Sequence, residues 1–519
     1  MLKTVLKQIG GLQVLLGGTM SLPMLVSLIY TEYYSALGFL VSGLIILTTG
    51  TVLFRGFSGS REPKNKDALI IAASGWLLLT IMGAIPFMII AYITPDPVLR
   101  GFIPADADFG SSLVYFKNPL HALFESMSAF TTTGLTMAVH EPTIGKGLLF
   151  YRSFAQWFGG AGVIVLSLAI LHRTPGQGAL LLYGSEASGE KLKPNVIGTA
   201  RAIWKVYVGI TALVTVYLVV GTWLILPDYG WDNILFDAVN HAMTGQSTGG
   251  FSTLDDSIAG YNSMEMDILY FLPMIMGALS IPFYFKVVFE RKFDLFWKDI
   301  QTRALLIASV LGGVLLSLLL FRSGLTGEPF RVGMFQFISA LSTTGWQTSD
   351  IGSWDDSSVA FIVCFAMFIG GAAGATVGGI KVIRSLIIVK GVRWQISKVF
   401  LPENSIKKVK FGGKVLLGEE MNRELAQAST FSFIYIVFVL VSTLLTTLFM
   451  GEGFTISDAL FEAASAQGTV GLSSGITVPE MSPVLETVYI LQMWAGRIEI
   501  IPVLVLIRAF IWGGDPRMI

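Results

Sequence analysis

The chain has little charge and almost no cysteine. Only 13% of its 519 residues are Asp, Glu, Lys or Arg, whereas 53% are hydrophobic, and the mean hydropathy is +0.68. Soluble globular proteins carry roughly 25% charged residues, so this composition excludes that class and predicts an integral membrane protein. The single cysteine, Cys364, excludes an intramolecular disulfide framework and a thiolate metal cluster.

Residues that form catalytic sites are also scarce. The four histidines are scattered without the spacing of metal ligands, at His121, His140, His172 and His241. No Gly-rich loop ending in Lys and Ser or Thr is present to hold a nucleotide phosphate, and the loop near 393–425 is too short for a nucleotide-binding domain. We therefore expect neither enzyme activity nor a cofactor, and no nucleic acid as a partner.

Apolar runs of about 20 residues, the length that crosses the hydrocarbon core of a bilayer, are abundant. Ten are present, near 7–30, 35–54, 68–94, 148–172, 202–226, 265–289, 303–321, 357–392, 428–450 and 486–511. Connections rich in Lys and Arg predict the cytoplasmic side, and they lie within 55–66, 173–205, 291–303 and 381–423. Both termini are then cytoplasmic. Six basic residues fall on the opposite side, namely Arg100, Lys117, Lys146, Arg152, Arg322 and Arg331.

Four shorter stretches lie between pairs of spans and align without gaps. They run from Ala122 to Leu135 (ALFESMSAFTTTGL), Asp237 to Gly250 (DAVNHAMTGQSTGG), Gly333 to Trp346 (GMFQFISALSTTGW) and Ala459 to Leu472 (ALFEAASAQGTVGL). A stretch of this length cannot cross a bilayer, so we interpret all four as re-entrant pore helices that enter from outside. One Thr/Gly turn would be an ordinary helix connection, but a fourfold repeat of it indicates a pore.

Each stretch ends in a hydroxyl residue, a small residue and a glycine, which we predict to form a selectivity filter. The residues are Thr132, Thr133, Gly134, Ser247, Thr248, Gly249, Thr343, Thr344, Gly345, Thr469, Val470 and Gly471. A dehydrated cation must regain oxygen ligands, and four extended backbones around one axis supply rings of carbonyls. Glycine permits the required turn, a Thr or Ser hydroxyl can complete the lowest ring, and the negative end of each short helix points to the ion.

One column of the alignment holds a polar residue within each apolar short helix. Its members are Glu125, Asn240, Gln336 and Glu462. Buried polar side chains usually belong to hydrogen-bond networks, so we favour a role in holding the filter backbone from behind. Direct coordination of the ion is the alternative.

Two features predict a gate on the ion path. The segment from Gly370 to Gly379 holds five glycines, Gly370, Gly371, Gly374, Gly378 and Gly379, and each weakens a helix by about 1 kcal/mol. Non-helical backbone at this depth lines a cavity or packs in protein, so we place the loop beneath the filter. Close helix packing through small residues is the alternative.

Arg497, inside the last span, is the second candidate for the gate, because an intramembrane arginine is costly. Its donors could satisfy carbonyls of the loop. The alternative is a pair with Glu499 or a neighbouring carboxylate near the membrane edge, whereas Lys381 and Arg384 are expected to face the cytoplasm.

These residues resemble the superfamily of Trk, Ktr and HKT cation transporters, most closely its TrkH/TrkG-type bacterial potassium uptake proteins. Besides the filters, the resemblance rests on Tyr151-Arg152 with 157–160, on 249–253 and on 370–381, and it spans nearly the whole chain. The fold is then all-α and integral to the membrane, with four pseudo-repeated helix, pore-loop, helix units around one pore. We place these units in 61–175, 176–295, 296–400 and 401–519, after two extra N-terminal transmembrane helices in 1–60.

The resemblance implies that the glycines Gly134, Gly249, Gly345 and Gly471 select potassium, which binds at the filter residues as the transported ion. It also implies a homodimer in the lipid of the bacterial cytoplasmic membrane, and a separate cytoplasmic nucleotide-binding regulator of the TrkA kind. The predicted function is potassium uptake through a channel-like pore gated by the Gly-rich loop and this partner. A sodium-conducting or ion-coupled cation symporter of the same superfamily is the alternative.

Overall fold

The part of the protein that the structure describes is mostly helical, with one small hairpin. The computed structural model describes residues 2–61, 63, 65–104, 107–171, 196–400, 408–412 and 414–512. Within these ranges the only strands are β1 (Lys408–Phe411) and β2 (Lys414–Leu417), which pair antiparallel with Lys408 opposite Leu417. The all-α prediction is therefore confirmed.

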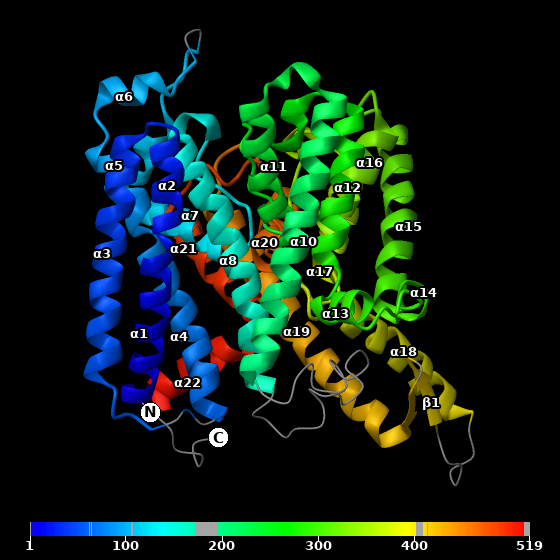
Figure 1. The fold of residues 1–519 in the computed structure, drawn as a ribbon. Helices are drawn as coiled ribbons and strands as arrows, with labels where there is room; N and C mark the ends of the chain where they lie inside the picture. The colour runs from blue at the N-terminus through cyan, green and yellow to red at the C-terminus, as the bar shows by residue number, and fades with distance from the viewer. Residues whose placement is uncertain are drawn as a thin grey trace.

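The helices follow one another as an N-terminal pair and four groups (Figure 1). The pair consists of α1 (Leu2–Thr19) with α2 (Ser21–Ile29), and α3 (Tyr33–Gly56). The first group contains α4 (Asn65–Gly83), α5 (Ile85–Ile93), α6 (Asp96–Gly101), α7 (Pro119–Phe130) and α8 (Lys146–Leu171). The second contains α10 (Val196–Ile225), α11 (Trp231–Gln246), α12 (Met264–Ala278), α13 (Ile281–Phe289) and α14 (Leu295–Lys298).

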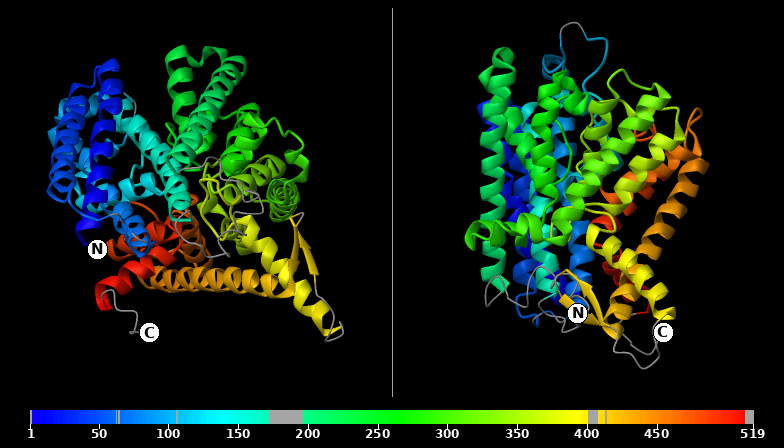
Figure 2. Two further views of the ribbon diagram at one scale, coloured as in Figure 1. Left: turned by 60° about the horizontal axis from the view of Figure 1, so that its bottom comes forward. Right: turned by 90° about the vertical axis from the view of Figure 1, so that its right-hand side faces the viewer.

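The third group contains α15 (Ile300–Ser323), α16 (Pro329–Leu341), α17 (Ser357–Ile369) and α18 (Val382–Val399). The fourth contains α19 (Gly418–Phe449), α20 (Ile456–Gly468), α21 (Pro483–Arg497) and α22 (Ile501–Trp512). Seen from the end where α1 begins and α22 lies, the groups surround a common centre (Figure 2). Each group has a long helix, a short inner helix and a second, often broken, helix.

The helices match the predicted membrane spans. Six are long and apolar enough to cross a membrane, and two bent pairs raise the total to eight among the described residues. The two remaining predicted spans are α8 and the interrupted segment α17–α18. Part of the second basic connection, including Arg173, Lys191 and Lys193, lies outside the described residues, as do His172 and Lys64.

Three predicted spans are not straight helices, because local chemistry breaks them. Between α12 and α13 the chain bends by 98°, where the Ser280 hydroxyl caps α13 and Pro282 cannot continue the preceding hydrogen-bond ladder. Between α21 and α22 it bends by 112°, just before Pro502. The third break, between α17 and α18, is the predicted Gly-rich loop.

Glycines set the contact between α1 and α3. A Cβ added at Gly50 would meet Val14 N at 2.7 Å and Gly10 O at 3.0 Å, and one at Gly17 would meet Leu47 N at 2.8 Å and Gly43 O at 3.0 Å. The backbones therefore approach closely enough for van der Waals contact along the whole pair, as small residues allow between membrane helices.

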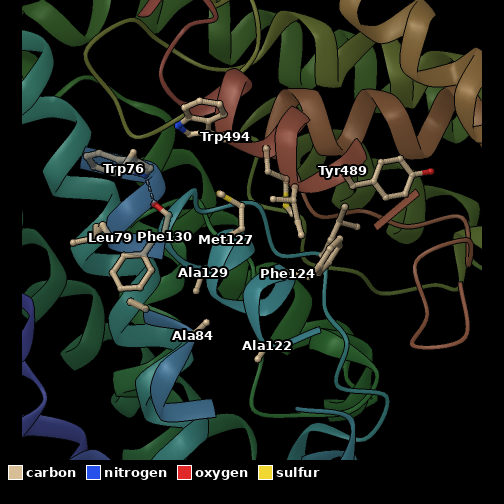
Figure 3. Close-up of a cluster of buried hydrophobic side chains, with 14 of the residues drawn as sticks. Trp76, Leu79, Ala84, Ala122, Phe124, Met127, Ala129, Phe130, Tyr489 and Trp494 are labelled. Carbon is tan, nitrogen blue, oxygen red and sulfur yellow. Dashed lines mark hydrogen bonds between the residues drawn. The ribbon is translucent and has the colours of Figure 1, made fainter. Parts of the chain in front are cut away.

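The short helix α7 lies in the core of the first group, against α4 and α21. Trp76 of α4 donates its Nε1–H to the carbonyl oxygen of Phe130 at 3.3 Å, and Trp494 of α21 donates to that of Ala73 at 3.0 Å. Figure 3 shows Phe124 and Met127 of α7 in the same cluster. The end of α7 is therefore fixed by packing and by a hydrogen bond from Trp76, while Trp494 ties α21 to α4 beside it.

We predict that Gly50→Val destabilises the protein by roughly 1–3 kcal/mol, the usual range for overpacking, because its side chain would overlap the α1 backbone. The measurement is the thermal midpoint in detergent, followed by size-exclusion chromatography. Gly18→Val is the matched control, since a Cβ there meets nothing within 4 Å. Equal midpoints for the two variants would contradict this account of the α1–α3 contact.

Candidate functional site

The four short helices α7, α11, α16 and α20 end at the centre of the molecule. Hydroxyl and amide side chains start two of them: Asn118 caps α7, and Thr455 with Asp458 forms a capping box on α20. Their C-termini, which carry the negative end of the helix dipole, point to the centre. A cation placed there would be stabilised by all four helix ends.

After each short helix the backbone repeats the same conformation. A threonine takes a positive φ, +54° at Thr132, +53° at Thr248, +54° at Thr343 and +49° at Thr469. Two residues later a glycine does the same, at Gly134, Gly250, Gly345 and Gly471. Non-glycine residues rarely adopt such angles, so the repeat shows four structurally equivalent segments. They are called the filter segments below, after the role that the sequence predicts for them.

The conformation corrects the predicted register of the second segment by one residue. Its filter residues are Thr248, Gly249 and Gly250, whereas Ser247 is the C-cap of α11 and has a helical φ. The Gly249 N–H donates to the carbonyl five residues back at 2.8 Å, as the Thr133 N–H does at 2.9 Å. The sequence pattern of hydroxyl, small residue and glycine fits either register because two glycines are adjacent, so only the backbone angles decide.

The filter segments close into a ring, each glycine facing the next segment. A methyl group added at Gly134 would collide with the carbonyl oxygen of Gly249. The same holds, segment by segment, for Gly250 with Thr344, Gly345 with Val470, and Gly471 with Thr133. The order of contacts, one to two to three to four and back to one, shows that the segments surround a single axis.

Hydroxyl groups lie at the inner end of this ring. The buried Oγ1 atoms of Thr132, Thr343 and Thr469 have no hydrogen-bond partner among the described residues. A buried hydroxyl without a partner costs free energy, and a dehydrated cation would supply the missing contact. The fourth hydroxyl, that of Thr248, instead lies 3.1 Å from the Thr376 hydroxyl.

Each short helix also carries a buried polar side chain that holds the backbone twelve residues further on. Glu125 accepts from the Met137 N–H at 2.8 Å, and Glu462 from that of Ser474 at 2.8 Å. The Gln336 amide is oriented with its oxygen toward two backbone N–H groups, and this oxygen accepts from the Thr348 N–H at 2.9 Å. This arrangement favours the supporting role over direct coordination.

In the second segment the supporting residue is His241 and not Asn240. The Thr253 N–H lies 3.4 Å from His241 Nε2, which preserves the spacing of twelve residues. Asn240 donates to the carbonyl of Phe236 in its own helix at 2.7 Å. The correction is the same shift by one residue that applies to the filter, because both belong to one helix.

The residue that supports the first segment, Glu125, forms an ion pair with Arg152. Arg152 Nε donates to Glu125 Oε1 at 2.6 Å, and Arg152 Nη2 donates to the Thr136 hydroxyl at 2.9 Å. The guanidinium also stacks over Phe251, 4.1 Å from the ring centroid, and so links the first segment to the second. A buried pair of this kind fixes geometry more than it adds stability.

On the outer side, the four filter glycines open into a cavity of about 350 Å³. Four carboxylates line it and no Lys or Arg does, among the described residues. They are Glu141, Asp255, Asp256 and Asp350. Burial raises the pKa of Glu141 well above its usual range, with Arg152 opposing the shift. The raised pKa favours the neutral form of Glu141, so the three aspartates Asp255, Asp256 and Asp350 are the side chains that attract cations to the mouth of the cavity.

On the inner side, the Gly-rich loop lies directly against the filter. Thr376 Oγ1 is 3.1 Å from Thr248 Oγ1 and donates to the carbonyl of Gln246 at 3.3 Å. A methyl group at Gly378 would collide with the carbonyl oxygen of Gly468, at the start of the fourth filter. A contact with another helix also holds the loop, since the Ala373 N–H donates to Gln301 Oε1 of α15 at 2.8 Å.

Arg497 reaches this loop from α21 and is buried. Its Nη1 donates to the carbonyl oxygen of Thr376, and its Nη2 to that of Gly159 at 3.2 Å. The alternative pairing with Glu499 is wrong. Glu499 instead binds Lys381 Nζ at 2.5 Å and Arg384 Nη2 at 2.7 Å, so these two side chains are held in the protein rather than simply facing the cytoplasm.

Sequence reasoning missed two residues that touch the filter. Gln156 donates from Nε2 to the carbonyl of Gly249 at 2.6 Å and accepts from the Phe251 N–H at 3.2 Å. Its side-chain amide therefore makes the two hydrogen bonds that the backbone of a neighbouring strand would make. Thr376 is the second. A buried Gln in an apolar span was a visible signal for the first, whereas only the folded loop reveals the second.

The chain is similar to known cation transport proteins over most of its length. The family model described as TrkH, cation transport protein, matches residues 101–513. An uncharacterized cation transporter of Methanocaldococcus jannaschii is 32% identical, with 97% of this chain and 94% of that protein covered. The Trk system potassium uptake protein TrkH of Salmonella typhimurium is 28% identical, with 98% and 99% covered.

The fold has also been solved in a similar protein. The crystal structure of the potassium transporter TrkH from Vibrio parahaemolyticus superimposes with a TM-score of 0.79 and 27% sequence identity. The match covers 99% of this chain and 100% of that one.

We predict that Gly250→Ala impairs cation flux more than Gly249→Ala does. At Gly250 an alanine must keep a positive φ, at about 1–2 kcal/mol, and would collide with the Thr344 carbonyl, which is backbone. At Gly249 the φ is ordinary, and the neighbour is the side chain of Gln156. Flux into liposomes at equal protein content measures the difference, and a more severe loss at Gly249 would contradict the corrected register.

Proposed function

Because the chain belongs to the TrkH family of cation transport proteins, and is therefore a multi-pass membrane transporter and not an enzyme, we propose that it takes up potassium through one channel-like pore. Relatives named as potassium uptake proteins cover nearly its whole length. The single observation that carries the proposal is the closed ring of four glycines and four carbonyls. A ring of this kind replaces the hydration shell of a cation.

The proposed ion path runs from the acidic cavity, past the glycine ring, to the threonine hydroxyls at the inner end. Cations gather in the cavity, lose water at the ring, and meet the unpartnered Oγ1 atoms of Thr132, Thr343 and Thr469. Transport is passive, since each inward positive charge gains roughly 2.3 kcal/mol per 100 mV of inside-negative potential. An ion-coupled symporter or a sodium-conducting pore is the competing function.

The proposed gate is the Gly-rich loop together with Arg497. The loop contacts the inner end of the filter through Thr376 and Gly378, and Arg497 binds the Thr376 carbonyl from the opposite side. Because a desolvated guanidinium holds backbone carbonyls, its removal should free the loop to leave the ion path.

The remaining proposals concern the setting of the pore. Both termini are cytoplasmic, in keeping with the basic connections, and the membrane is the cytoplasmic membrane. The protein forms a homodimer with one pore per subunit, and a cytoplasmic nucleotide-binding partner opens the gate. These two follow from the resemblance to the Trk-type family.

Rubidium uptake into liposomes tests the function. With an inside-negative potential, we expect potassium, but not sodium or lithium, to compete with rubidium. We expect Gly345→Asp to abolish uptake, because its side chain would collide with the Val470 carbonyl and disrupt the ring. Uptake without a second ion or proton gradient is expected. Equal competition by sodium, or a strict need for such a gradient, would favour the competing function.

For the gate, we predict that Arg497→Ala increases basal uptake by at least several-fold, in line with the loss of one or two charged hydrogen bonds at about 1.5–3 kcal/mol each. Arg508→Ala is the matched control, because Arg508 lies on exposed α22 surface and carries the same charge. Deletion within 370–379 should act like Arg497→Ala. If both gate variants conduct like the parent protein, the loop is not the gate.

A further inference from the structure

At the position twelve residues before the supported backbone N–H, the second filter segment has an imidazole, whereas the other three have a carboxylate or an amide. An oxygen of Glu or Gln accepts a hydrogen bond without further conditions, but a histidine nitrogen accepts only while it lacks a proton. The contact from the Thr253 N–H to His241 Nε2 therefore depends on where the imidazole proton lies.

Hydrogen bonds behind the filter determine that position, beginning at Asp237. A carboxylate only accepts, and Asp237 accepts from the hydroxyls of Tyr229 at 2.6 Å, Thr253 at 2.6 Å and Tyr261 at 3.1 Å. Tyr261 thereby uses its only proton. Its oxygen is left to accept from another donor.

That donor is Tyr270, whose hydroxyl lies 3.2 Å from the Tyr261 oxygen and donates to it. Having used its proton, Tyr270 can only accept from His241 Nδ1, which is 2.6 Å away. Nδ1 must then carry the imidazole proton. Nε2 is left with its lone pair toward the Ser252 hydroxyl at 3.1 Å and the Thr253 N–H.

We propose that His241 is the positioning residue of the second filter segment, neutral and protonated on Nδ1, and that Asp237, Tyr261 and Tyr270 hold it in that tautomer. This proposal rests on the proposed function, in which the filter selects potassium. Ser252 and Thr253 come two and three residues after Gly250, so loss of the His241 contacts loosens the outer end of the segment.

The same network reaches the third filter. Trp346, the residue after Gly345, packs edge-on against the Tyr270 ring at 5.0 Å and against the His241 ring at 5.8 Å. Displacement of His241 therefore disturbs two of the four segments that form the ring. Because selectivity depends on the geometry of the ring, we expect displacement of His241 to affect selectivity more than any other property.

The chain itself supplies the test variants. His241→Gln restores an acceptor oxygen of the kind used by Gln336, whereas His241→Leu has similar bulk and no acceptor. Asn240→Leu is the matched control, because the one side-chain hydrogen bond of Asn240 to a described residue stays within its own helix. The measurement is the ratio of potassium to sodium competition in rubidium uptake, at equal amounts of purified, monodisperse protein.

We expect His241→Leu to lower the ratio roughly two- to tenfold, the effect of losing one buried hydrogen bond, and His241→Gln and Asn240→Leu to keep it near the parent value. Tyr270→Phe should lower the ratio in the parent but not in His241→Gln, because a Gln oxygen accepts without Tyr270. The comparison of Tyr270→Phe in the parent and in His241→Gln still tests the proposal if His241→Leu does not fold.

Three results would overturn the proposal. A parent protein that does not prefer potassium overturns the proposed function and this inference together. A selective parent with equal ratios in His241→Leu and Asn240→Leu overturns only the role of His241. An equal loss in Tyr270→Phe with and without His241→Gln shows that Tyr270 acts by packing and overturns the tautomer.

Discussion

Backbone-to-backbone contact at the filter is the constraint on which the rest of the structure depends. Four segments approach so closely that a single methyl group at any of the four filter glycines would collide with a neighbouring carbonyl. Four carbonyl dipoles that face one axis repel one another when no cation lies between them. The surrounding protein must therefore hold each segment in place from behind.

The supports differ in chemistry although the geometry repeats. In the first segment the supporting carboxylate pairs with Arg152, and in the second the support is the His241 imidazole. In the third it is the Gln336 amide, and in the fourth the Glu462 carboxylate, which accepts from hydroxyl groups. The inner end is also unequal, because three threonine hydroxyls have no hydrogen-bond partner among the described residues, whereas that of Thr248 lies 3.1 Å from the Thr376 hydroxyl. The second segment is thus the one whose threonine hydroxyl contacts the Gly-rich loop.

The loop and α21 join this contact to the inner end of the molecule. Arg497 binds the loop carbonyls beneath the filter, and two residues later Glu499 binds both Lys381 and Arg384 at the end of the loop. The bend between α21 and α22 places these oppositely charged side chains together. These ion pairs therefore connect the bend between α21 and α22 to the end of the loop and the start of α18.

The sequence alone determined the membrane class, the positions of the spans, the four short helices, the glycine break and the candidacy of Arg497, because length, hydropathy and repetition are local properties. Only the tertiary structure decided the filter register at Gly250, the support by His241, the roles of Gln156 and Thr376, and the partner of Glu499. Adjacent glycines satisfy the pattern in either register, and contacts between distant segments leave no periodic trace in the chain. These features depend on which backbones meet around the axis, and that is fixed only when all four groups have packed together.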